Sequence, residues 1–125
     1  MVAKPLCPLY KNIIKPLDRA RYPELRYHFG ETTFSYNNNE LRTRSSRVLI
    51  TSRQADILRL LAKNIGNVVS KEMIQEAVWG TVSYANSLAV NVQMTYLRHA
   101  LQHDATVKIE SLKKKGYVLS VISPE

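Results

Sequence analysis

The residues that build many catalytic and ligand-binding loops are scarce in this 125-residue chain. It contains 4 glycines and 1 cysteine, and it has no GxSxG, GxGxxG or P-loop pattern. Such loops use glycine where the backbone must approach a phosphate or present a nucleophile. His99 and His103 have the spacing of two zinc ligands, but no third ligand accompanies them. An enzyme is therefore the least favoured class, and neither a cofactor nor a metal is expected.

The chain also lacks a long apolar run and a second thiol. A helix that spans a bilayer needs about 20 consecutive apolar residues, and no such run is present. Lys4, Pro5 and Pro8 interrupt the segment where a signal peptide would be apolar. Cys7 cannot form an internal disulfide, which favours a reducing compartment. We therefore expect a soluble, cytoplasmic protein with no membrane in the chain as given.

Acidic residues are few as well. The chain has 10 Asp and Glu against 18 Lys and Arg, which gives a net charge of +8. This excess favours a polyanionic partner, although basic charge also serves solubility or membrane surfaces. The hydrophobic fraction of 45% is typical of a globular protein, and the length suits one domain.

The sequence pattern changes after residue 25. Residues 1–25 hold four of the five prolines, so we expect an N-terminal extension or linker there, followed by a domain at residues 26–125. From Arg26 to Ile50 apolar and polar residues alternate, and Asn37 to Asn39 interrupt the alternation as a turn would. This pattern predicts an antiparallel sheet of three or four strands with one face that needs cover.

Two helices are expected next. Thr51 and Gln54 have the spacing of a capping box, and Gly66 is expected to end the first helix. Ser70 is expected to cap a second helix that Gly80 ends. The residues of the second helix that we expect to face the core are Met73, Ile74, Ala77 and Val78.

A third helix is predicted at Ser87 to Leu101, with Ser87 as its N-cap. Its inward positions are Val90, Met94, Leu97 and Leu101. The opposite side carries Asn91, Val92, Thr95, Tyr96 and His99, with Arg98 at its edge. Solvated helices are usually covered by Glu and Lys instead, so this face is typical of a contact surface. A strand, a turn at Lys113 to Gly116 and a second strand are expected to follow.

This order of elements resembles the winged-helix DNA-binding domain of the OmpR/PhoB transcriptional regulators. The resemblance rests on Thr51 to Leu61, Val69-Ser70-Lys71-Glu72, Val78-Trp79-Gly80, Leu97-Arg98 with Leu101, and Ile109 to Leu119. The last segment is closest to the ToxR/CadC-like branch. The resemblance implies an α+β fold, a winged helix-turn-helix with an N-terminal antiparallel sheet, three helices and a C-terminal β-hairpin wing. Without a receiver domain or membrane helix, we expect a soluble relative of the ToxR-like regulators or part of a longer chain.

The resemblance also implies a bacterial transcriptional regulator that binds double-stranded DNA sequence-specifically. Helix 87–101 would enter the major groove, and the wing at 113–116 would lie near the minor groove. Base contacts are expected from Asn91, Thr95, Tyr96, Arg98 and His99, with Tyr96 where the family often has arginine. Backbone or minor-groove contacts are expected from Ser70, Ser87, Lys113, Lys114 and Lys115. RNA polymerase at the loop from Gly80 to Asn86 and a dimer on repeated half-sites are further expected partners.

Other interpretations stay open from the residues alone. The same fold could serve as a protein-interaction module that binds a regulator or an RNA polymerase subunit. Tyr96 could be a half-buried surface aromatic, and the wing lysines could be a solvated turn. Arg98 could be a structural partner of Asp104 or Glu110.

Overall fold

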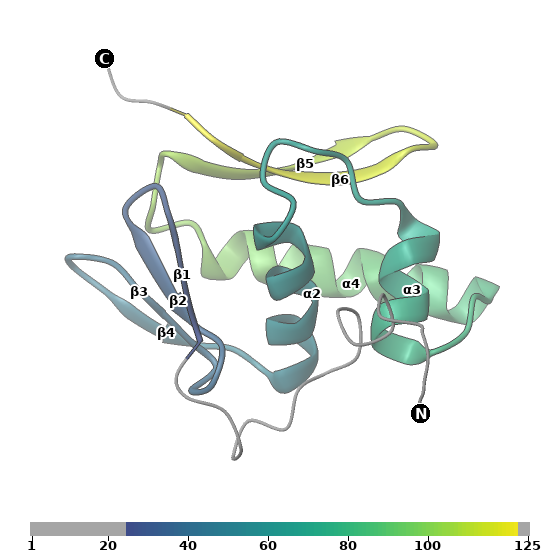
Figure 1. The fold of residues 1–125 in the computed structure, drawn as a ribbon, viewed down its shortest axis with the longest axis horizontal. Coiled ribbons are helices and arrows are strands. Elements are labelled where there is room, and N and C mark those ends of the chain that lie inside the picture. The colour runs from purple at the N-terminus through teal and green to yellow at the C-terminus, as the bar shows by residue number, and fades with distance from the viewer. Residues whose placement is uncertain (1–24, 123–125) are drawn as a thin grey trace, which may run out of the picture.

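The computed structural model describes residues 25–122 and has the predicted order of elements (Figure 1). An N-terminal sheet comprises β1 (Arg26–Phe29), β2 (Thr32–Ser35), β3 (Glu40–Arg42) and β4 (Arg47–Leu49). The helices are α2 (Ser52–Ala62), α3 (Lys71–Trp79) and α4 (Tyr84–Ala100). The hairpin, which we call the wing, comprises β5 (Val107–Leu112) and β6 (Gly116–Val121). The predicted α+β winged-helix arrangement is confirmed.

The sheet pairs its four strands in chain order, each antiparallel to the next. Phe34 lies opposite Tyr27 on one neighbouring strand and opposite Leu41 on the other, and Leu41 lies opposite Val48. Because side chains alternate along a strand, these apolar residues share the face that packs on the core. Asn39 has a φ of 53°, which confirms the left-handed turn predicted there.

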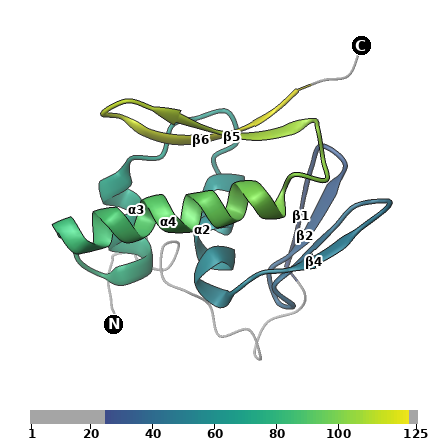
Figure 2. The same ribbon diagram turned by 180° about the vertical axis from the view of Figure 1, so that it is seen from behind.

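Helix α2 lies at the centre of the fold (Figures 1 and 2) and contacts β1, α3, α4 and β6. The predicted capping box begins it: Thr51 Oγ1 accepts from Gln54 N at 3.1 Å, and Gln54 Oε1 accepts from Thr51 N at 3.0 Å. The predicted end at Gly66 is wrong, because the helix stops at Ala62. The Asn64 side-chain amide donates to a last-turn carbonyl of this helix at 2.8 Å, which terminates it early.

Helix α3 begins and ends as predicted. Ser70 Oγ accepts from Met73 N at 3.0 Å, and Gly80 has a φ of 84° at the C-cap. Ile74 and Ala77 are buried. The inward prediction for Met73 is wrong, since this side chain is 45% exposed. About 100° of rotation per residue carries it away from the Ile74 side of the helix.

Helix α4 begins one turn earlier than predicted. Its N-cap is Ser83, whose Oγ accepts from Asn86 N at 3.0 Å. The prediction of Ser87 as N-cap is therefore wrong, because Ser87 lies within the helix. The physical reason is a contact to α3: Ser83 N donates to the buried Gln75 Oε1 at 2.9 Å, which fixes the cap position.

The wing has a third, short strand partner. Val69 exchanges two backbone hydrogen bonds with Tyr117, at 2.8 and 2.9 Å. Gly116 has a φ of 142°, and a Cβ atom there would clash with the Val69 carbonyl. Only glycine therefore lets the wing pack this closely on the segment before α3.

One cluster of buried apolar residues joins all of these elements. It includes Phe34 of β2, Leu58 of α2, Ile74 of α3, Leu97 of α4 and Leu119 of β6, each fully buried. Sheet, helices and wing are therefore held on one core. Within residues 25–122, no helix combines the length and apolar character that crossing a membrane requires. The predicted extension at residues 1–25 lies outside the described residues, apart from Leu25, and stays a prediction.

Candidate nucleic-acid interface

Helix α4 has a buried side and an exposed side, and it runs beneath the wing in Figure 2. Val90, Met94 and Leu97 are fully buried, which confirms the predicted inward stripe. Tyr96 is 56% exposed and lies outside the apolar core. One helix thus connects the core to a solvent-facing surface.

The outer face of α4 consists of the exposed residues farthest from the buried stripe: Leu88, Val92, Thr95, Tyr96 and His99. Three of the five predicted base-contacting residues are brought together here. Leu88 and Val92 are absent from that prediction, which favoured hydrogen-bonding groups. The sequence signal for them is an apolar series at four-residue spacing that runs from Tyr84 to Tyr96, where a solvated helix would carry charge.

Some polar side chains of this face already hydrogen-bond to other groups of the protein near α4. Thr95 Oγ1 donates to the Asn91 carbonyl at 3.2 Å. Thr95 therefore presents a methyl group and acceptor lone pairs outward, rather than a donor. His99 Nε2 lies 3.4 Å from the Gln102 side-chain nitrogen, still on the exposed surface.

Arg98 lies on the flank of α4 that faces the wing and is bonded to it. Its Nε donates to the Ile109 carbonyl at 2.9 Å, and its Nη2 donates to Ser111 Oγ at 2.8 Å. The guanidinium also lies 5.8 Å from the centre of the Tyr117 ring. The interpretation as a structural partner had the right role but the wrong acceptors, because a backbone carbonyl and a hydroxyl take the place of carboxylates.

Asn91 lies on the same flank, and Tyr117 OH donates to its Oδ1 at 2.8 Å. Burial raises the pKa of Tyr117, although the charge of Arg98 and a hydrogen bond from Ser111 act in the opposite direction. Tyr117 therefore keeps its hydroxyl hydrogen at neutral pH. Two hydrogen-bonded contacts, from Arg98 and from Asn91, fix the wing against α4.

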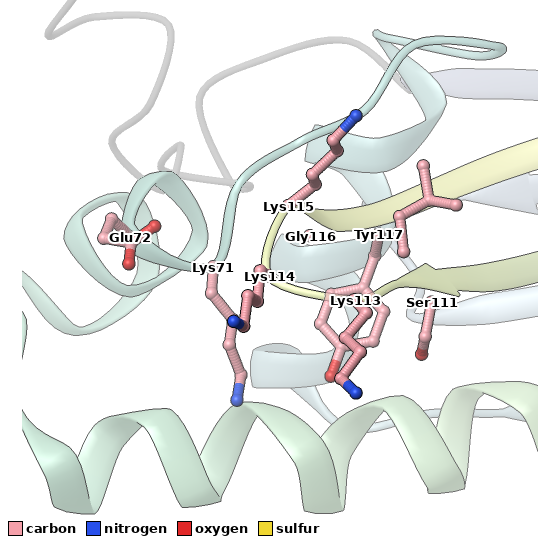
Figure 3. A pocket seen from close by; sticks show the side chains of 9 residues that line it. Lys71, Glu72, Ser111, Lys113, Lys114, Lys115, Gly116 and Tyr117 are labelled. Carbon is pink, nitrogen blue, oxygen red and sulfur yellow. The ribbon is translucent and has the colours of Figure 1, made fainter.

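A cleft of about 240 Å³ opens between the start of α3 and the tip of the wing (Figure 3). The residues that give it its charge are Lys71, Glu72, Lys113, Lys114 and Lys115. Lys71 Nζ donates to Ser87 Oγ at 3.0 Å, so this ammonium group is held over α4. Sequence reasoning missed Lys71, because only the fold places it beside the wing.

The three wing lysines are exposed but differ in direction. Figure 3 shows Lys113 and Lys71 extending towards α4, whereas Lys115 points to the opposite side of the wing. Lys114 has a φ of 65° at the turn. Ser70 caps α3 next to this cleft, as predicted, and leaves its first-turn amides near the lysines.

The segment predicted to contact RNA polymerase is shorter as a loop than expected, because α4 starts at Tyr84. Asn86 Nδ2 donates to the Thr81 carbonyl at 3.0 Å, which closes the turn. Val82 and Tyr84 remain 49% and 80% exposed. An apolar patch therefore lies at the start of α4.

Residues 45–119 match the sequence family described as "Transcriptional regulatory protein, C terminal". The matched segment covers more than half of the chain and includes all three helices. The chain belongs to this family. Its domain is of the OmpR/PhoB type of transcriptional regulators, as the sequence resemblance implied.

Two curated regulators illustrate the relationship. The chain is 25% identical over 99 residues to the transcriptional regulatory protein RprY of Bacteroides fragilis, covering 79% of this chain and 42% of that protein. It is 32% identical over 88 residues to the response regulator ArlR of Staphylococcus aureus, covering 70% of this chain and 40% of that protein. The chain thus spans about two fifths of the length of these relatives.

Solved structures share the fold. The DNA-binding domain of CpxR from E. coli aligns with a TM-score of 0.68 at 21% identity, covering 82% of this chain and 100% of that one. The DNA-binding domain of E. coli CadC aligns with a TM-score of 0.67 at 23% identity, covering 82% and 96%. These nearly equal scores do not separate the predicted ToxR/CadC-like branch from the response regulators.

Proposed function

We propose that this domain regulates transcription in the cytoplasm by placing α4 in the major groove of duplex DNA, with the tip of the wing against the backbone or the minor groove. The observation that carries the proposal is that α4, which bears the exposed outer face, lies beside a lysine-lined cleft, because Lys71 of that cleft donates to Ser87 of α4. A helix fits the major groove, where every base pair presents a distinct pattern of donors, acceptors and methyl groups.

We assign a role to each residue of this interface according to whether its side chain already has a hydrogen-bond partner inside the protein. Thr95, Tyr96 and His99 are proposed to meet base edges, and Leu88 and Val92 to contact thymine methyl groups. Arg98 and Ser87 have hydrogen-bond partners within the domain. We therefore assign these two residues positioning roles in place of the DNA contacts expected from sequence.

Phosphate contacts are assigned to the cleft. Lys113, Lys114 and Lys71 supply ammonium groups there, and the amides that follow Ser70 add the positive end of the α3 dipole. Lys115 points to the other side of the wing, so its phosphate or minor-groove contact would be made separately. Such contacts hold the register of the protein without specifying sequence.

The test is the salt dependence of binding to a random duplex, measured with the purified chain without metal or nucleotide. We expect log affinity to fall with log salt at a slope of roughly −3 to −6, about 0.9 per phosphate neutralised. A flat dependence, or no binding at low salt, would reject DNA binding in favour of a protein-interaction module.

The exposed Val82 and Tyr84 support a second contact, with RNA polymerase through the segment from Gly80 to Asn86. Replacing both with serine is expected to leave DNA affinity unchanged and to lower transcription from a bound promoter in a purified system. Equal transcription by both proteins would remove this contact. A dimer on repeated half-sites stays a prediction.

A further inference from the structure

Two hydrocarbon side chains, Leu88 and Val92, lie exposed at the middle of the outer face of α4. About 100° of rotation per residue places them roughly 40° apart around the helix, on the side opposite the buried stripe. Neither belongs to the apolar core of the domain. With the exposed Tyr84 and Tyr96 they form one row along the helix. A continuous apolar row, unlike a single exposed residue, marks a contact surface.

Helix α4 offers few groups that read guanine or cytosine. It contains one arginine and no lysine, aspartate or glutamate. That arginine is Arg98, whose Nε and Nη2 both donate to groups of the wing. Guanine is typically read by arginine or lysine, and cytosine by a carboxylate. The outer face of α4 therefore lacks the usual readers of a G·C base pair.

Hydrocarbon side chains can read one feature of the major groove, which is the methyl group at carbon 5 of thymine. Leu88 and Val92 have neither a donor nor an acceptor, so they form no hydrogen bond with the oxygen or the amino group at carbon 4 of a pyrimidine. Cytosine lacks the methyl group, but 5-methylcytosine carries it on the same ring atom as thymine. A contact made only through the methyl group therefore treats thymine and 5-methylcytosine alike.

The surroundings of Leu88 indicate that duplex DNA is the partner of this row. The adjacent Ser87 accepts from Lys71 Nζ at 3.0 Å, and Lys71 belongs to the lysine-lined cleft. The apolar row thus borders a cluster of cations. Duplex DNA presents the matching pair of features, because methyl groups line the major groove and phosphates lie along its edges. An apolar protein surface would match the row and leave the cations without a partner.

We propose that Leu88 and Val92 make this domain a reader of 5-methyl groups, so that the positions they contact accept thymine and 5-methylcytosine and disfavour unmethylated cytosine. The inference rests on the proposed function, because it assumes that α4 lies in the major groove. It adds an input to regulation, since a site with cytosine at such a position gains affinity when that cytosine is methylated. The two residues are about 6 Å apart along the helix, roughly two base-pair steps, so each addresses its own methyl group.

The experiment changes the DNA and leaves the protein as it is. The preferred duplex is obtained by selection from a random pool, and each of its thymines is then replaced singly by deoxyuridine, which removes only the methyl group. At the positions contacted by Leu88 or Val92, the affinity of the wild type should fall roughly fourfold, the value of one buried methyl group. A C·G pair at those positions should also bind weakly, and methylation of that cytosine should recover roughly fourfold.

Serine variants show which side chain reads which methyl group. Leu88→Ser and Val92→Ser should each lose the response to deoxyuridine at one position and keep it at the other. The matched control is Leu49→Ser, which removes an exposed leucine from β4 of the sheet and should keep both responses. Thermal melts check that each variant folds. If one does not, the wild-type comparison of the duplexes still decides, because only the DNA differs there.

Three results would overturn the proposal. The first is equal affinity for thymine and deoxyuridine at every position of the site. The second is a cytosine that gains nothing from methylation at a position where removing the thymine methyl weakens binding. The third is a methyl response that survives both serine variants, because another residue would then be the reader. Failure of the wild type to bind any duplex at low salt would instead reject the proposed function.

Discussion

The N-terminal sheet and the tip of the wing are both basic, but basic side chains of the sheet are paired with a carboxylate and, among the described residues, those of the wing tip are not. In the sheet, the Glu40 carboxylate pairs with Arg42 at 3.1 Å and with Arg47. The hydrogen bond from Arg47 lowers the pKa of Glu40, against the effect of burial. At the wing, Lys113 and Lys114 have no carboxylate partner among residues 25–122. Unpaired cations, rather than net charge, therefore support the proposed nucleic-acid contact at the wing.

A second carboxylate that is satisfied within the protein lies at the junction between the sheet and α4. Asp104 is 2% exposed and accepts from Thr32 Oγ1 at 2.6 Å, Glu31 N at 2.7 Å and Thr106 N at 2.9 Å. Burial alone would raise the pKa of Asp104, but hydrogen bonds from Thr106, Thr32 and the backbone outweigh it and lower that pKa. This region is built for stability, so its variants should affect folding and spare DNA recognition.

The largest difference in stability is expected between two aromatic substitutions, one in the sheet and one on the outer face of α4. Phe34 is fully buried and stacks on Tyr27, with ring centres 5.8 Å apart. Phe34→Ala should lower the free energy of unfolding by about 3–5 kcal/mol through lost burial and a cavity. Tyr96→Ala should change it by less than about 0.5 kcal/mol, since the ring is exposed, and should weaken binding to the preferred site. Urea unfolding of both variants checks this; equal destabilisation would mean that α4 is rotated from the orientation described.

A smaller loss of stability is expected from Asp104→Asn. The new amide would point a donor at a backbone N–H, either that of Glu31 or that of Thr106, which can only donate, and this costs about 1–3 kcal/mol. Because the folded pKa of Asp104 is lowered, its contribution is present above the unfolded value and is lost as the pH falls below about 4. Thermal melts from pH 7 to pH 3 should therefore converge for wild type and variant at the acid end. Parallel curves would mean that Asp104 is not the linked group.

The parts of this molecule that the sequence predicted are those determined by neighbours in the chain. The capping box at Thr51 and the left-handed Gly80 are local, so pattern alone located them. The errors come from contacts across the fold. Ser83 and Ser87 are equivalent caps in sequence, and only Gln75 of α3 distinguishes them.

The candidate interface shows the same limit. The outer face of α4 was predictable because helical rotation follows from spacing. The partners of Arg98 were not, since a backbone carbonyl of β5 has no signature in the sequence. Lys71 and Tyr117 likewise join the interface only when the wing packs beside α3 and α4.

At the wing, removing charge should affect binding and spare the fold. Lys113→Ala combined with Lys114→Ala should weaken binding to all sequences and reduce the salt slope by about 0.9 for each lost phosphate contact. The melting temperature should stay nearly unchanged, because both side chains are exposed. Lys108→Ala is the control, since this exposed lysine pairs opposite Ser120 at the other end of the wing. A slope that changes equally in the control would make the effect one of net charge alone.

The smallest effects are expected from removing one positive charge from the sheet and one from the wing. This pair of variants also tests most directly whether the two regions use their charge differently. The Arg47 side chain is 62% exposed and its charge is already paired with Glu40. Arg47→Ala should therefore cost at most about 1 kcal/mol of stability and leave DNA affinity and its salt slope unchanged. Lys114→Ala removes the same charge, yet it should reduce both. Measuring the two variants side by side in equal salt separates local phosphate contact from the long-range field, which falls off within about 10 Å at 0.1 M salt. Equal losses of affinity would show that the sheet is part of the interface.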